Sequence, residues 1–188
     1  MARIILTGDK IRLRPLSKKD IPLTIKRNLD PKVLKWTAGS VSLDARIKRA
    51  ASKKMEYFVK RRPKNDKIFI IEAKNGGRWE PIGNCGLSNI NKWNHRAVFS
   101  ICIDPDYWQR GYGTEATKLL LAYAFEKMHL HRIESHVREY NTPSIVFHRK
   151  FRFIEESRQK EAIFQNGRFW DRIIFRLLES EWENLDRQ

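Results

Sequence analysis

Two glycines and an arginine stand where a predicted strand gives way to a predicted helix. Gly111 and Gly113 flank Tyr112, directly after Arg110, and the run that follows has apolar residues at helical spacing. The first backbone N–H groups of a helix have no partners within it and lie at the positive end of the helix dipole. Glycines there let an anion approach the backbone without meeting a Cβ atom. The segment therefore predicts a site for a pyrophosphate group.

Three kinds of nucleotide-binding loop use such a turn. A Walker loop needs Gly-Lys-Ser/Thr after its last glycine, but Gly113 is followed by Thr114 and Glu115. A dinucleotide fingerprint is a closer alternative, because residues 111–116 read GYGTEA and match G-x-G-x-x-A. That fingerprint places its glycines directly after the strand and an acid at the end of the next strand. Here residues 104–110 separate the strand from the glycines, and Glu134 comes early in its strand.

The third alternative is an acyl-CoA site. Residues 107–116, YWQRGYGTEA, resemble motif A of the GNAT acyl-CoA N-acyltransferases, most of all the branch that contains the RimJ/RimL and spermidine N-acetyltransferases. Residues 141–153 resemble motif B, in which an Asn and a small residue open a helix that ends in Gly-Phe. Residues 161–171 resemble the closing hairpin, with Asn166-Gly167 as a two-residue turn, and residues 10–16 resemble the opening strand. The resemblance covers nearly the whole chain.

This resemblance implies an N-acetyltransferase in which an amine attacks the thioester of acetyl-CoA (coenzyme A). It implies that the pyrophosphate lies on backbone amides of the glycine turn. It also implies that the strand ending at Ile103 splays from the strand starting near Arg132, so that the pantetheine arm pairs with free backbone and an amide there faces the oxyanion. The expected cofactor-binding residues are Ser100, Ile101, Cys102, Ile103, Trp108, Gln109, Arg110, Gly111, Tyr112, Gly113, Thr114, Asn141 and Ser144.

Acid and base groups depart from the family pattern. Many relatives carry a Glu base in the strand that ends at Ile103, where this chain has Val98. Many place a Tyr seven residues after the motif B Asn, as the acid that protonates the thiolate; that position is His148 here. Histidine ordinarily titrates near neutrality, so His148 is a candidate catalytic residue, and the alternative is a solvated or structural histidine. Ser144 is the second candidate, because RimL-like members have a serine near the thiolate; the alternative is a first-turn cap. Arg152 stands where the motif has glycine.

Hydrophobic periodicity predicts the helices and strands that must position these residues. It predicts helices at 17–28, 42–60, 112–128 and 142–150, and strands at 11–13, 68–73, 82–90, 96–103, 132–137, 151–164 and 169–178. This order is also the GNAT order. We therefore expect an α+β (mixed α/β) fold, with a central mixed, mostly antiparallel seven-stranded sheet and helices on both faces.

Composition limits the alternatives further. The 188 residues suffice for a single domain, 1–188, without a secretory signal or a membrane-spanning run, so we expect a cytoplasmic protein. Cys85 and Cys102 fall in apolar strands and are expected to be reduced core thiols. No Cys/His spacing suggests a metal site, and His129 and His131 would lie on different helix faces.

The net charge of +16 indicates an anionic partner. Basic residues crowd the predicted helix 42–60 and its exit: Arg46, Lys48, Arg49, Lys53, Lys54, Lys60, Arg61, Arg62, Lys64 and Lys67. This cluster is a docking surface, a solvated helix face or a sign of a hot-adapted host.

The missing base bears on the acceptor amine. A lysine or polyamine amine has a pKa of about 10.4 and a peptide α-amine one of about 7.7–8.0, so only the α-amine is partly neutral at pH 7. We therefore expect the acceptor to be the N-terminal α-amine of a protein. The basic charge favours an acidic or ribosome-associated protein as that acceptor, and an RNA-bearing particle as a further partner. A polyamine or aminoglycoside acetyltransferase, an acyl-CoA sensor and a nucleic-acid-binding module are the alternatives. The sequence leaves a monomer and a homodimer equally open.

Overall fold

The computed structural model describes residues 5–37, 53 and 65–186. The predicted helix at 42–60, except for Lys53, and its basic cluster, except for Lys53 and Lys67, lie outside these residues. Within them, eight strands form one sheet in the order β1-β2-β3-β4-β5-β6-β8-β7. The strands are β1 (Leu6–Thr7), β2 (Ile11–Pro15), β3 (Lys67–Asn75), β4 (Arg78–Asn91), β5 (Arg96–Ile103), β6 (Arg132–Arg138), β7 (Ile154–Gln165) and β8 (Arg168–Leu178).

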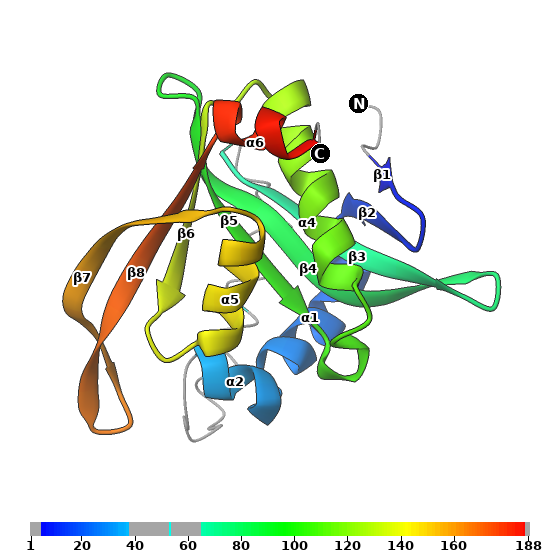
Figure 1. The fold of residues 1–188 in the computed structure, drawn as a ribbon. Coiled ribbons are helices and arrows are strands. Elements are labelled where there is room, and N and C mark those ends of the chain that lie inside the picture. The colour runs from blue at the N-terminus through cyan, green and yellow to red at the C-terminus, as the bar shows by residue number, and fades with distance from the viewer. Residues whose placement is uncertain (1–4, 38–52, 54–64, 187–188) are drawn as a thin grey trace.

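The helices of the described residues connect and cover this sheet (Figure 1). They are α1 (Ile21–Asn28), α2 (Pro31–Thr37), α4 (Tyr112–Ala122), α5 (Thr142–Lys150) and α6 (Glu179–Asp186). A 3₁₀ turn, η1 (Lys18–Asp20), leads into α1, and a second, η2 (Pro105–Tyr107), follows β5. A π turn, η3 (Tyr123–Lys127), continues α4. No described helix has the length and apolar character needed to cross a membrane.

Strand alternation gives the sheet two different faces. One face carries Leu13, Ile71, Phe99 and Phe175, which join Leu120 of α4 in the main apolar core. These side chains fill the space beneath α4 and α5, because successive strand residues point to opposite faces.

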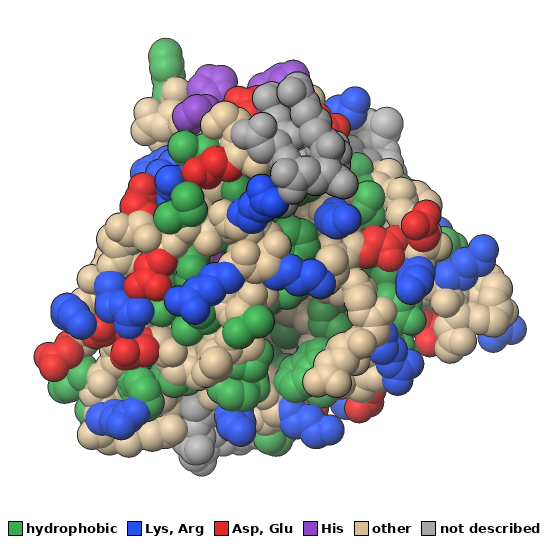
Figure 2. All heavy atoms as spheres, in the orientation of Figure 1, with side chains coloured by type: hydrophobic (Ala, Val, Ile, Leu, Met, Phe, Trp, Pro, Cys, Tyr) green, Lys and Arg blue, Asp and Glu red, His purple; other side chains and the backbone are tan. Residues whose placement is uncertain are grey.

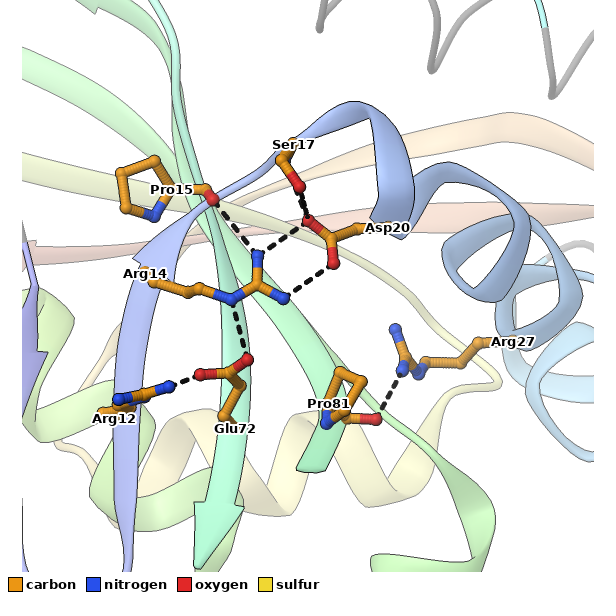
Figure 3. A network of polar contacts seen from close by, with 8 residues as sticks. All are labelled: Arg12, Arg14, Pro15, Ser17, Asp20, Arg27, Glu72 and Pro81. Carbon is orange, nitrogen blue, oxygen red and sulfur yellow. Dashed lines mark hydrogen bonds and ion pairs between the residues drawn. The ribbon is translucent and has the colours of Figure 1, made fainter. Parts of the chain in front are cut away.

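The opposite face is polar where it meets α1. Arg14 of β2 donates to Glu72 of β3 and to both carboxylate oxygens of Asp20, with donor–acceptor distances of 2.7 Å (Figure 3). Because Asp20 directly precedes α1, this network attaches α1 to the second face. Helices therefore cover both faces, as predicted.

The two central strands separate along their length. β5 and β6 are parallel, but they pair only through Arg96–Val98 and Arg132–Glu134. All other neighbouring strands are antiparallel. Figure 1 shows β5 and β6 diverging, with α5 along the opening and α1 and α2 near its wide end. The predicted splay is thus present.

Three described elements were not predicted. β1 has two residues, too few to show periodicity, so the seven-strand prediction is one strand short. The break before Pro31 ends α1 as predicted, but Pro31 then opens α2, since proline fits the first turn of a helix and Asp30 accepts from the amide of Lys32 at 2.8 Å. Helix α6 at the C-terminal end was also missed.

The predicted strand start at Phe151 is wrong. Arg152 has a φ of +55°, in the left-handed region that usually terminates a helix. This residue ends α5 and delays β7 until Ile154. Arg152 thus takes the conformation that glycine would supply at this position of the family motif.

Candidate functional site

The glycine turn has the backbone shape of an anion site. Gly111 caps α4 with a φ of +84°, and a Cβ atom built there would meet no atom within 4 Å. Gln109 also has a positive φ, of +61°. Left-handed residues next to ordinary ones turn successive N–H groups toward one point, and the free amides of the first turn of α4 add to them. The turn therefore fits a pyrophosphate group.

Contacts at the end of β5 hold this turn in place. The indole Nε1 of Trp108 donates to the carbonyl oxygen of Ile103 at 2.8 Å. Asp104 caps η2 by accepting from the amide of Asp106 at 3.4 Å. Trp108, predicted to bind the cofactor, thus supports the loop through a bond to the strand end.

Beyond Val98, β5 has backbone groups on the side facing β6 that no strand of the described residues pairs with. The amide of Asp104 donates to the carbonyl of Ile82 at 2.8 Å, which fixes which residues of β5 bond to β4. Alternate residues of an antiparallel ladder direct their N–H and C=O groups to opposite sides. Since pairing with β6 ends at Val98, the backbone groups of Ile101 and the amide of Ile103 face the opening.

Ser100 and Cys102 are the alternate residues of β5, which direct their backbone groups to the opposite side. Their backbone groups point to β4, opposite Gly86 and Asn84. Of the four β5 residues predicted to pair with the pantetheine arm, two therefore have backbone groups that no described strand pairs with: Ile101, and Ile103 through its amide. Figure 2 shows the surface hollowed between α4 and α5, over this part of the sheet.

Asn141 joins two helices at the wide end of the opening. Its Oδ1 accepts from the amide of Ser144 at 3.2 Å and caps α5, and its Nδ2 donates to the carbonyl of Trp36 in α2 at 3.3 Å. Its side chain amide is therefore occupied by protein groups. Its backbone is occupied too, since its N–H donates to the carbonyl of Arg138 at 2.9 Å and its carbonyl accepts from the amide of Ile145 at 3.1 Å.

His148 lies at the narrow end of the opening, only 3% exposed. Its Nε2 is 2.7 Å from the hydroxyl of Ser135, and its Nδ1 is 2.7 Å from the carbonyl oxygen of Ser144 and 3.3 Å from the Ser144 hydroxyl. Burial lowers the pKa of His148, against the opposing effect of the Ser144 carbonyl. The two predicted catalytic residues are therefore in contact, one buried and one half-buried.

Sequence reasoning missed Ser135 and Lys150. Ser135 is buried one residue beyond the last residue of β6 that pairs with β5, and a serine at an inward position of an alternating strand gave the only signal. Lys150 directs its Nζ to within 3.4 Å of the Thr114 hydroxyl in the first turn of α4. A cation at that position favours phosphate binding on the glycine turn.

The described thiols are poor nucleophiles. Burial raises the pKa of Cys85 far above its usual range and that of Cys102 to about 11, the latter against the lowering effect of Arg27. Among the described residues, no group of His, Cys, Asp and Glu side chains is arranged to hold a metal ion.

A surface cavity of about 510 Å³ lies away from these residues. It is at the opposite end of β5 from the glycine turn and is lined by Asn65, Asn89, Ile90, Asn91, Lys92, Trp93 and Arg96. None of these lining residues belongs to the glycine turn or to the part of β5 beyond its pairing with β6, so we place the acyl site at the splay.

Known proteins are similar to this chain in sequence and in fold. Residues 10–154 match the family model described as an acetyltransferase (GNAT) domain. The chain is 27% identical over 177 residues to the uncharacterized N-acetyltransferase p20 of Bacillus licheniformis, covering 94% of this chain and 97% of that protein. It is 26% identical over 168 residues to the spermidine N(1)-acetyltransferase of Escherichia coli K12, covering 89% and 85%.

A solved structure agrees in fold. The spermidine N-acetyltransferase from Vibrio cholerae, in complex with CoA and spermine, superposes with a TM-score of 0.78 at 22% identity, covering 94% of this chain and 100% of that one.

Proposed function

This chain belongs to the GNAT acetyltransferase family and is an acetyl-CoA-dependent N-acetyltransferase, and we propose that its acceptor is the N-terminal α-amine of a protein. The observation that carries the finer proposal is the charge around the opening. Helices α1 and α2 contain Lys26, Arg27, Lys32 and Lys35 and no acidic residue. They adjoin the opening through the contacts of Asn141 with Trp36 and of Arg27 with Asp104.

This charge disfavours a polycation as the acceptor. A polyamine carries several ammonium groups, and like charges close together raise its free energy of binding. A protein N-terminus followed by acidic residues brings one reactive amine and favourable charges. With a net charge of +16, the whole molecule, and not only this region, repels polycations and attracts acidic partners.

Acetyl-CoA, when bound, supplies the acetyl thioester that the amine attacks. We assign the pyrophosphate to the amides of residues 109–114, with Lys150 as an added cation. The free edge at Ile101 and Ile103 pairs with the amide groups of the pantetheine arm. One of these N–H groups donates to the thioester oxygen as that oxygen gains negative charge, which lowers the barrier. The splay also holds both reactants together.

Attack by the amine is direct in this proposal. The other route would pass the acetyl group through a cysteine, but only a thiolate is a good nucleophile, and the raised pKa of Cys102 keeps that thiol protonated near neutral pH. An α-amine needs no strong base, because about one in ten such groups is already neutral at pH 7. This agrees with Val98 at the position where many relatives have Glu.

Thiol release from acetyl-CoA tests the acceptor. We expect kcat/KM for a peptide with a free N-terminus followed by acidic residues to exceed that for spermidine at least tenfold. The same peptide with a blocked N-terminus is the control and should give background release. Turnover of spermidine above every peptide would overturn the proposal. It would favour the second candidate, a polyamine N-acetyltransferase, to which the similarity with the Escherichia coli protein points.

A further inference from the structure

Three residues at the splay form a connected polar chain inside an aromatic environment. We propose that Ser135, His148 and Ser144 form a one-directional hydrogen-bond chain in which neutral His148 is a positioning residue that directs the Ser144 hydroxyl proton into the opening. The inference rests on the proposed function only for the role of Ser144 at the leaving thiolate. The geometry of the chain stands apart from the identity of the acceptor.

The direction of the chain follows from what each atom can do. The carbonyl oxygen of Ser144 only accepts, so Nδ1 of His148, 2.7 Å away, must carry a proton and donate. In a neutral imidazole the other nitrogen is then an acceptor. The hydroxyl of Ser135, 2.7 Å from Nε2, must therefore be the donor. One tautomer of His148 satisfies both contacts.

This tautomer decides what the Ser144 hydroxyl can do. Its oxygen lies 3.3 Å from Nδ1 of His148, which already carries a proton, so the oxygen can accept there but cannot donate. The Ser144 proton is left for another acceptor. Donors aligned in one direction polarise one another, which strengthens the last hydrogen bond of the chain.

Aromatic packing fixes the ring of His148. The ring stacks on Phe175 with centroids 5.2 Å apart and an interplanar angle of 18°. Phe99 and Phe153 meet it edge-on, at 6.0 and 5.2 Å. Removal from water disfavours the charged imidazolium. The ring is therefore held neutral and in one orientation.

The position of His148 separates the two strands. The last pair between β5 and β6 is Val98 with Glu134, and the next residues are Phe99 in β5 and Ser135 in β6. His148 contacts both of these residues. Figure 1 shows α5 running from the wide end of the opening toward the narrow end. Ser144, one turn earlier in α5, is thus nearer the wide end, where the pantetheine arm and the thiol must lie.

In the reaction, the amine nitrogen bonds to the acetyl carbon, the carbon–sulfur bond breaks, and the electron pair leaves with sulfur. The Ser144 hydroxyl donates a hydrogen bond to this thiolate and keeps its own proton. The proton lost by the amine passes to solvent. His148 acts only through Ser144, by holding the hydroxyl in its donating orientation.

Nitrogen NMR of histidine-labelled protein measures the tautomer directly. At pH 7.5 we expect one histidine, the signal absent in His148→Phe, to be neutral with its proton on Nδ1. A proton on Nε2, or a charged ring, would overturn the proposal. The measurement needs no substrate, so its failure is distinct from failure of the acceptor proposal.

A double-mutant cycle tests whether the chain acts through Ser144. With whichever amine the wild type acetylates, Ser135→Ala should lower kcat about fivefold, the size expected for one hydrogen bond, and leave KM for acetyl-CoA within about twofold. In a Ser144→Ala background, Ser135→Ala should have no further effect on kcat. An equal loss in both backgrounds would show that Ser135 serves the fold alone and would overturn the proposal, as would an unchanged kcat in the single variant.

Ser88→Ala is the matched control. Its hydroxyl donates to the carbonyl of Val98 at 3.4 Å, so the variant also removes a serine hydrogen bond beside β5, but on β4 and outside the chain. We expect kcat of this variant to equal that of the wild type. If Ser88→Ala lowered kcat as much as Ser135→Ala, the effect would be general to the strands and the proposal would fail.

Discussion

The carboxylate Oδ2 of Asp104 lies 3.8 Å from the guanidinium Nε of Arg27. Arg27 is 2% exposed at the C-terminal end of α1, and Asp104 begins the loop that leads to the glycine turn. Among the described residues the Nε and Nη1 atoms of Arg27 have no hydrogen-bond partner, and its Nη2 donates to the carbonyl of Pro81 at 3.4 Å. One buried cation thus joins the acceptor side of the opening to the cofactor side.

Removing the charge of Asp104 should cost more than removing that of Arg27. Asp104→Asn keeps the oxygen that caps η2 but leaves Arg27 buried without its nearby carboxylate. Since Asp104 is 26% exposed, we expect a loss of about 2 kcal/mol in the free energy of unfolding, below the range for a fully buried pair. Arg27→Met should cost less, because it leaves no buried charge. Urea titration measures both free energies.

The double variant provides the control for this pair. Once Arg27 is methionine, Asp104→Asn should add little further loss, since the unpaired cation is gone. Losses that simply add in the double variant would contradict the coupling of these two residues.

Gly111→Ala should weaken acetyl-CoA binding. An alanine at a φ of +84° costs about 1 kcal/mol of strain, and its methyl group enters the open side of the turn, where we place the pyrophosphate. We expect KM for acetyl-CoA to rise about tenfold, equivalent to 1.4 kcal/mol of lost binding. Steady-state kinetics at saturating acceptor measures this change.

Gly77→Ala is the control for backbone strain. Gly77 has a φ of +83° and no atom within 4 Å of a built Cβ, and it lies in the β3–β4 turn, at the end of a hairpin that projects away from α4 (Figure 1). The thermal stability of Gly77→Ala should fall as much as that of Gly111→Ala, but its KM for acetyl-CoA should equal that of the wild type. Equal KM values in the two variants would argue against a pyrophosphate at Gly111.

Trp108→Phe should loosen the cofactor loop without unfolding the protein. The change removes the indole bond to the carbonyl of Ile103, and with it about 1 kcal/mol that holds the loop against β5. We expect KM for acetyl-CoA to rise about threefold and kcat to change little.

The control for this indole bond is Trp170→Phe. In the wild type, Nε1 of Trp170 donates to the carbonyl of Gln165 at 3.2 Å in the β7–β8 hairpin. A KM effect of the same size there would show that the kinetics do not depend on the loop at residue 108.

Local patterns predicted the parts of the site that lie within one segment. The glycines around Tyr112 and the cap at Asn141 could be recognised, because helix termini need residues of those types near them in sequence. The bond between Asn141 and the carbonyl of Trp36 spans 105 residues and depends on how α2 packs. Likewise, the contact of His148 with Ser135 depends on the splay, so a single sequence could name the histidine but not its environment.

Acid should reveal the contribution of Asp20 to stability. Burial raises the pKa of Asp20, but the hydrogen bonds from Arg14 and Ser17 outweigh that effect and leave the pKa below its ordinary value (Figure 3). A carboxyl group whose pKa is lowered by folding stabilises the native state above its unfolded pKa of about 3.9. That stabilisation is lost as the pH falls through the lower folded value, because the native state must then bind the proton.

Asp20→Asn should therefore lower the free energy of unfolding by about 3 kcal/mol at pH 7, since it breaks one side of a buried pair. Below about pH 4 this difference should shrink, as the wild type loses the same ionic interaction. Urea unfolding of both proteins at pH 7, 5, 4 and 3 measures this difference in free energy. Protonation of the other carboxylates affects both proteins alike and largely cancels in the difference. A difference that stays constant from pH 7 to pH 3 would mean that the charge of Asp20 does not contribute, and that only its shape supports the start of α1.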